Sequence, residues 1–311
     1  RIAQSRFFLK GLANFVMRGR LQALVVIMAG AGSLLFCWIS AAALALVILR
    51  KGVGSGAWLF MWALLPAGTL LYAYGDSGPM TLLVGTMVLA LVLRSTVSLS
   101  LAVLAGVGVG VLTGLALMAF SAEYLNQMVA FFSEFLGALE EQLSKEGQPI
   151  VLSRPEAGQI AGMLGAVTAT MSALCLLLAR YWQAALYNPG GFGAEFKALQ
   201  YSTAVSSTLA VAAIALWGLG EQYRSWAMIC LLPLTFAGLA LIHARVEALG
   251  QSKGWLTWFY IIWLLFDPVK FLLVLFVIAD SWINFRQRWL KAPGKELNKH
   301  DERDQKDDRD I

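Results

Sequence analysis

The chain contains 311 residues, of which 59% are hydrophobic and 14% are charged, and its formal net charge is +5. A soluble domain of this size needs more polar surface than this composition supplies, so we expect an integral membrane protein. The basic residues flank apolar segments, as membrane orientation requires, and this distribution explains the positive charge without nucleic-acid binding.

Apolar runs recur along the chain from Leu21 to Trp282. They do not alternate as outer-membrane strands do, and a helix satisfies its own backbone polar groups inside a bilayer. We therefore predict an all-α, polytopic transmembrane bundle of about eight to ten segments. The candidate segments are 21–34, 36–49, 56–74, 79–93, 97–120, 157–179, 201–219, 226–243, 255–266 and 269–283.

The first two and the last two candidate segments are short, so each pair is either a helical hairpin or one long helix. Gly30 and Gly32 offer a break in the first pair, and Asp267-Pro268 interrupts the last pair. A hairpin at the start places seven of the ten basic residues between the terminal pairs in the cytoplasm, whereas one long helix reverses this ratio. We therefore predict short hairpins at both ends.

The charge pattern divides the chain into three parts. Residues 1–20 are predicted to form a basic, cytoplasmic N-terminal segment, and residues 21–285 the transmembrane domain. Residues 286–311 are rich in charge and poor in apolar side chains, so we expect a disordered cytoplasmic tail. The predicted location is a bacterial inner (cytoplasmic) membrane, with several passes and both termini inside.

One strongly amphipathic stretch, at about residues 122–146, does not have the pattern of a span. Met128, Phe131, Phe135 and Leu139 share one helical side, while charged side chains lie elsewhere. We predict a helix on the extracytoplasmic membrane surface. It is either a fixed interfacial element or a mobile lid over a cavity.

A ridge of small residues is formed by Gly106, Gly110 and Gly114, which are four residues apart and therefore stack on one helix face. Such a ridge lets another backbone approach closely. It is typical of packing between neighbouring helices of one chain, and the alternative is docking to a second protein.

The most distinctive segment runs from Arg180 to Lys197, where aromatic side chains precede a strong helix stop. Aromatic belts and snorkelling arginines occur at membrane boundaries for structural reasons, and Arg180 and Glu195 can pair across the turn. The alternative is contact with a ligand or partner. The candidate residues are Arg180, Tyr181, Trp182, Gln183, Asn188, Pro189, Gly190, Gly191 and Glu195.

Asp267 and Lys270 are the candidate polar residues at membrane depth. Charges there cost at least ~2.5 kcal/mol each at a helix centre, so they pair, face water or have a function. Spaced three apart, they can neutralise each other on one helix face. In a hairpin, Asp267 simply belongs to an exposed turn.

Enzyme signatures are missing from the sequence. It has no phosphate-binding loop, zinc-protease or serine-hydrolase motif, and its two histidines and three cysteines do not cluster. We predict no enzymatic activity, no catalytic residue, no metal site and no cofactor.

Three segments have distinctive sequences, namely Asn14–Ala23, Arg180–Phe192 and Asp280–Arg286. In these segments, and over roughly residues 14 to 290, the chain resembles the YybS-like family of bacterial membrane proteins. That family is distantly similar to the substrate-binding subunits of energy-coupling-factor transporters and to the cell-shape protein MreD.

This resemblance implies two functions. The first is a transporter-like or substrate-binding membrane subunit that depends on a separate energising module, and it predicts a polar-lined cavity near mid-membrane. The second is a non-transporting scaffold or assembly protein that binds another membrane protein in the bilayer. It predicts partners that co-purify.

Overall fold

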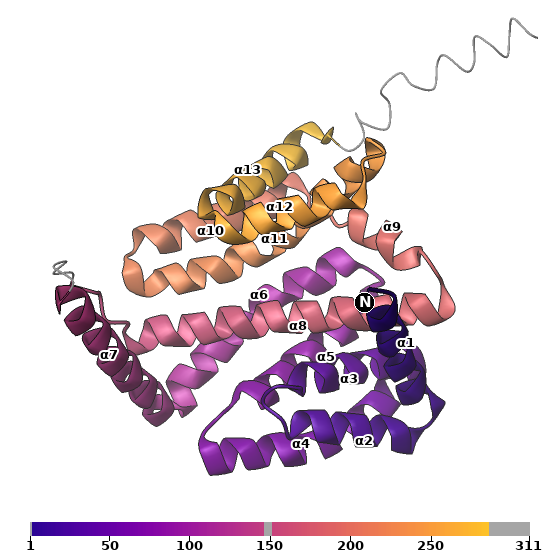
Figure 1. The fold of residues 1–311 in the computed structure, drawn as a ribbon, viewed down its shortest axis with the longest axis horizontal. Helices are drawn as coiled ribbons and strands as arrows, with labels where there is room; N and C mark the ends of the chain where they lie inside the picture. Colours follow the sequence, from indigo (N-terminus) through magenta and orange to yellow (C-terminus); the bar gives the residue numbers. More distant parts are fainter. Residues whose placement is uncertain (1, 146–150, 286–311) are drawn as a thin grey trace, which may run out of the picture.

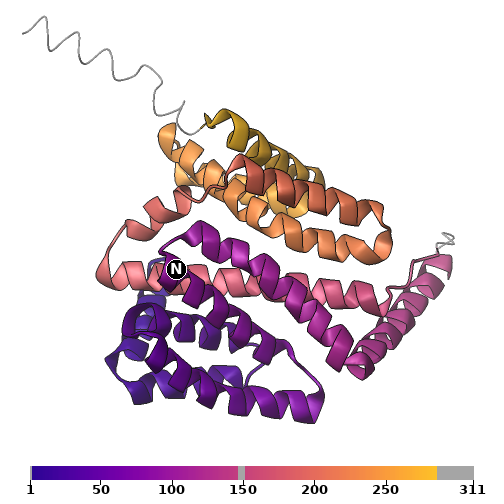
Figure 2. The same ribbon diagram turned by 180° about the vertical axis from the view of Figure 1, so that it is seen from behind.

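The computed structural model describes residues 2–145 and 151–285, and over these residues it contains thirteen helices and no strand (Figures 1 and 2). The first six helices are α1 (Ile2–Arg18), α2 (Arg20–Ala31), α3 (Cys37–Lys51), α4 (Val53–Tyr74), α5 (Gly78–Thr96) and α6 (Leu99–Phe120). The others are α7 (Ala122–Lys145), α8 (Ala157–Tyr187), α9 (Gly191–Lys197), α10 (Thr203–Gly218), α11 (Glu221–Ala248), α12 (Lys253–Leu265) and α13 (Asp267–Ile283).

The described residues form a multi-pass helical membrane protein, which confirms the predicted fold class. Five helices are long and apolar enough to cross a bilayer, namely α4, α5, α6, α8 and α11, and the bent pair α12–α13 makes up to six. Helices α2 and α10 are apolar but shorter. Large apolar side chains such as Leu112, Ile214, Leu264 and Phe276 are more than half exposed, as lipid-facing side chains are.

Both terminal pairs of segments are broken, as predicted. Helices α2 and α3 pack against each other, and Ser40 Oγ donates a 2.6 Å hydrogen bond to the Ile27 carbonyl across the pair. Helices α12 and α13 are bent by 113° at Phe266. Pro268 lies in the first turn of α13, where it needs no helical donor and where it stops α12 from continuing.

Helix α3 is the centre of the N-terminal half of the molecule. It contacts α1, α2, α4, α5 and α8, and every residue from Ser40 to Ile48 is buried. A helix that is apolar on all sides is stable only where neighbours surround it. The predicted basic segment 1–20 joins this packing, since it is largely helix α1 and its Ala13 and Val16 are fully buried.

Helix α8 has 31 residues and runs through the middle of the bundle, between the α1–α5 group and the α10–α13 group (Figure 1). The glycine ridge of α6 faces it. A Cβ on Gly110 would lie 3.0 Å from the Gly165 carbonyl oxygen, and one on Gly114 would lie 3.0 Å from that of Ala161. Gly106 faces Leu232 of α11 instead. The ridge therefore packs helices of one chain.

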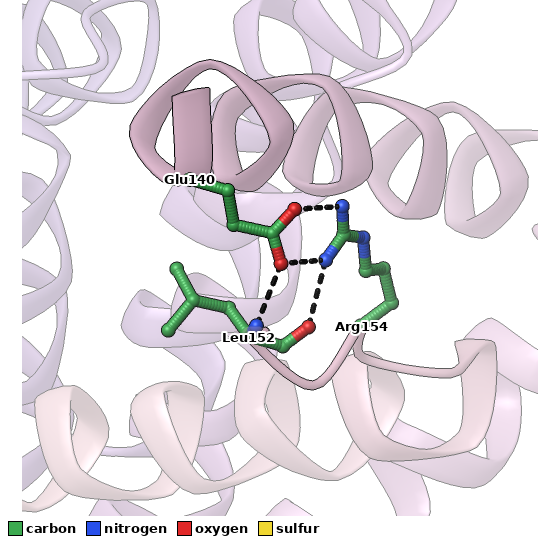
Figure 3. A network of polar contacts seen from close by, with 3 residues as sticks. All are labelled: Glu140, Leu152 and Arg154. Carbon is green, nitrogen blue, oxygen red and sulfur yellow. Dashed lines mark hydrogen bonds and ion pairs between the residues drawn. The ribbon is translucent and has the colours of Figure 1, made fainter. Parts of the chain in front are cut away.

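The amphipathic helix α7 lies across one end of the bundle (Figure 1). Its Leu125 is buried with Leu117 and Ile160, and its Glu140 is held by the segment that leads into α8. Arg154 donates to both Glu140 oxygens, at 2.5 and 2.7 Å, and the Leu152 amide donates to Oε1 at 2.6 Å (Figure 3). We call this group the α7 clamp.

Candidate functional site

The loops gather at two ends of the bundle, and several basic residues lie at the end opposite α7. Arg50, Arg94, Arg180 and Lys197 all lie there, since contacts described below join the ends of α3, α5, α8 and α11. We call it the basic end. Its main feature is the segment Arg180–Lys197, the α8–α9 elbow.

The elbow turns where the sequence predicts a stop. Helix α8 ends at Tyr187, and the Asn188 amide donates a last helical hydrogen bond of 2.8 Å to the Ala184 carbonyl. Gly190 then adopts φ +91°, a left-handed conformation that glycine tolerates best. The Gly191 amide closes the turn on the Asn188 carbonyl at 3.1 Å, and α9 begins.

An ion pair braces the two sides of this turn. Arg180 Nη2 of α8 lies 2.7 Å from Glu195 Oε2 of α9, the pairing expected from the sequence. Arg180 Nη1 also donates to Gln183 Oε1 at 3.3 Å. The two charged side chains are only 20% and 24% exposed, so the pair is screened less than a surface pair.

A row of aromatic rings connects the elbow to α11 and α12. Neighbouring ring centroids are 6.0, 5.9, 5.5 and 5.9 Å apart, and the row ends in a 2.9 Å hydrogen bond between His243 Nε2 and the Tyr260 hydroxyl. Lys197 pairs with Glu247 beside the row. The rings belong, in order, to Tyr181, Phe192, Phe196, His243 and Tyr260.

Two arginines at helix ends join neighbouring helices at the basic end: Arg50 joins α3 to the elbow, and Arg94 joins α5 to α3. The Arg50 guanidinium lies 4.1 Å from the centre of the Tyr187 ring, a cation–π contact. Arg94 Nη1 donates to the carbonyls of Ile48 at 3.0 Å and Leu49 at 2.9 Å, which are among the last carbonyls of α3. The position of each basic residue at a helix end is the only sequence signal for these contacts.

The candidate residues of the elbow therefore have different surroundings. Trp182 is fully buried in α8 and cannot be reached from the surface. Arg180 and Glu195 are occupied with each other. The longest exposed stretch of the elbow is its tip, Tyr187–Gly190. Of the candidate residues, Asn188, Pro189 and Gly190 are therefore the most accessible from outside.

Asp267 and Lys270 lie apart from the elbow, in the first turn of α13. Asp267 Oδ1 accepts from Lys270 Nζ at 2.7 Å, and the side chains are 79% and 40% exposed. They neutralise each other at the break between α12 and α13 and form no buried site.

Two hydroxyls are buried in the core between α3, α5 and α8. Ser172 Oγ lacks a hydrogen-bond partner among the described residues, and the neighbour of the Thr86 hydroxyl is the weakly bonding Cys175 thiol. Thr86 and Ser172 are fully buried, and a Cβ on Gly85 would lie 2.5 Å from Ser172 Oγ. Cys175 lies beside Thr86 and close to Cys37. In residues 2–145 and 151–285, no three His, Cys, Asp or Glu side chains are placed to hold a metal ion.

No family model, curated protein or solved structure matches this chain. Function is therefore inferred from its own geometry.

Proposed function

We propose that this protein is a non-transporting scaffold of the bacterial inner membrane, with the basic end and both termini in the cytoplasm. The observation that carries the proposal is the packing of α3, which is buried on every side from Ser40 to Ile48. A transport path needs a polar lining and room for its substrate. A closely packed apolar centre is instead suited to a rigid platform.

The elbow tip Tyr187–Gly190 is the surface that this platform would offer to a partner. It is exposed, and the ion pair, the aromatic row and the Arg50 contact all fix the backbone around it. A rigid surface loses little conformational entropy on binding, which favours affinity. The excess of basic residues at this end supports a cytoplasmic location.

Membership of the YybS-like family is part of this proposal, because the resemblance implies a scaffold as one of its two functions. A YybS-like protein with an MreD-like role would bind another membrane protein rather than carry a substrate. No separate ATPase module is then required.

Photo-crosslinking in intact membranes tests the scaffold. A photoreactive residue at Asn188 should give a discrete protein adduct, whereas one at Leu219, which is 65% exposed at the opposite end, should not. Glu195→Gln should weaken the Asn188 adduct, because it loosens the turn behind the tip. Absence of an Asn188 adduct, or the same adducts from both positions, would contradict the proposal.

A substrate-binding subunit is the second candidate. The unpartnered Ser172 hydroxyl, with the Thr86 hydroxyl in the same core, favours it. Buried polar groups without partners are costly, and a bound ligand could satisfy them. Native mass spectrometry of the purified protein distinguishes the two functions. A stoichiometric small molecule that is lost in Thr86→Val/Ser172→Ala would support substrate binding and overturn the scaffold.

A further inference from the structure

A hollow of about 200 Å³ opens at the basic end between α2, α3 and α4. Its rim carries Arg20 from the start of α2, Lys51 from the end of α3 and Ser55 from the first turn of α4. Its floor is apolar and includes the buried residues Val47 and Leu59. No Asp or Glu lines it, so its charge is positive.

Among the described residues, the side chains of Arg20 and Lys51 make no ion pair, hydrogen bond or ring contact. This sets them apart from their neighbours, since Arg50 stacks on a tyrosine and Arg94 binds carbonyls of α3. Arg94 also donates to the carbonyls of Ile48 and Leu49, and its positive charge opposes the negative field of the α3 C-terminus near the hollow. Two positive side chains therefore meet at a cavity without a counter-charge.

The first turn of α4 adds hydrogen-bond donors to the same place. Gly52 precedes α4 with φ +105° and provides no side-chain cap, so the first amides of the helix lack an intrahelical acceptor. A Cβ on Gly54 would meet no atom within 4 Å, so the space in front of this turn is open. Backbone amides, an ammonium and a guanidinium are the donors that bind phosphate groups.

The exposed aromatic and apolar side chains of α4 favour a lipid headgroup as the source of that phosphate. Trp58 borders the hollow and packs edge-to-face on Trp62, with ring centroids 6.1 Å apart. Both rings are about two-fifths exposed. Met61 between them in the sequence is 70% exposed, and Leu65 beyond them is 56% exposed. Tryptophan is enriched at the level of lipid headgroups, and the apolar stripe beyond it can accept acyl chains.

We propose that the hollow binds the phosphate of an anionic phospholipid headgroup, with the acyl chains along Trp58, Trp62 and Leu65. Arg20, Lys51 and the first turn of α4 hold the phosphate, and the tryptophans set its depth. The proposal concerns a surface away from the elbow tip and does not depend on the scaffold function.

Native mass spectrometry of the delipidated full-length protein tests it, with phosphatidylglycerol, phosphatidylcholine and inorganic phosphate as probes. Phosphatidylglycerol should bind more tightly than phosphatidylcholine, and Arg20→Gln/Lys51→Gln should weaken it roughly tenfold through loss of charge-assisted hydrogen bonds. The matched control is Lys10→Gln/Arg18→Gln, which removes two exposed cations of α1 that do not line the hollow. This control should change binding by less than about twofold, because charges without direct contact are largely screened.

A second pair of variants leaves the charge unchanged. Gly54→Val fills the mouth of the hollow, whereas Gly68→Val adds the same side chain to open space elsewhere on α4. Only Gly54→Val should reduce phosphatidylglycerol binding. Equal losses in both glycine variants or in both charge variants would overturn the proposal. So would displacement of the lipid by inorganic phosphate, which would assign the hollow to a soluble phosphate compound.

Discussion

The two ends of the bundle are held together in different ways. At the basic end, an ion pair, a cation–π contact, a row of aromatic rings and arginine contacts to carbonyls join α3, α5, α8, α9, α11 and α12. At the other end, α7 depends on a small apolar cluster around Leu125 and on the α7 clamp. Redundant contacts tolerate the loss of one member, whereas a single charge pair can act as the weak point.

The largest loss of folding stability is expected at the close contact between α6 and α8, which runs between the two ends of the bundle. We call this contact the seam. In Gly165→Leu the new side chain meets the Gly110 carbonyl, since even a Cβ would lie 2.4 Å from its oxygen. We expect a loss of roughly 1–3 kcal/mol or more in stability, because closely packed helices must separate. Thermal unfolding in nanodiscs measures it.

Gly108→Leu is the matched control for the seam. Gly108 lies on α6, the other helix of the seam, and a Cβ there would meet no atom within 4 Å, so the same substitution should leave stability nearly unchanged. If both variants unfold at the same temperature, the seam does not hold the two halves together.

An intermediate loss of folding stability is expected at the elbow. Arg180→Gln and Glu195→Gln should each cost about 1–2 kcal/mol, less than loss of one member of a fully buried pair, since both side chains keep some contact with solvent. A double-mutant cycle separates the pair energy from other effects. The exposed pair Lys145–Glu141, with side chains 73% and 70% exposed, should give only ~0.3–0.5 kcal/mol in the same cycle. Equal coupling energies in the two cycles would remove the contrast between the ends.

The smallest loss of stability is expected at the α7 clamp, and in the unsubstituted protein it should appear only at acid pH. The Arg154 hydrogen bonds and the Leu152 amide lower the pKa of Glu140 from its ordinary 4.5 to about 2. Because the folded pKa is depressed, the stabilisation is complete above pH 4.5 and disappears as the pH falls towards 2. A nitroxide at Ser144 of α7 should become more mobile over that range, as measured by electron paramagnetic resonance.

Two variants isolate this clamp. Glu140→Gln should make the label mobile at neutral pH and abolish its acid response. Glu141→Gln removes an exposed carboxylate one residue away and should keep that response. An unchanged acid response in Glu140→Gln would assign the transition to other groups.

Local features of the fold could be predicted because their causes are local. The break at Asp267-Pro268, the stop at Asn188–Gly191 and the amphipathic helix α7 all follow from residue type and spacing. The Arg180–Glu195 pair was also expected, because one turn brings its members together. By contrast, the Arg50–Tyr187 contact and the hollow between Arg20 and Lys51 join distant segments, so spacing could not reveal them.

The sequence by itself determined that this protein is an all-helical membrane protein, where its segments break and which ends are basic, because hydropathy, proline and charge act within a few residues. Tertiary structure alone decided which apolar faces are covered: α3 is buried on every side, whereas Leu112 of α6 and Ile214 of α10 remain exposed. The physical reason is the bilayer. Lipid chains are as apolar as a packed core, so a lipid-facing and an inward-facing side chain can be the same residue type.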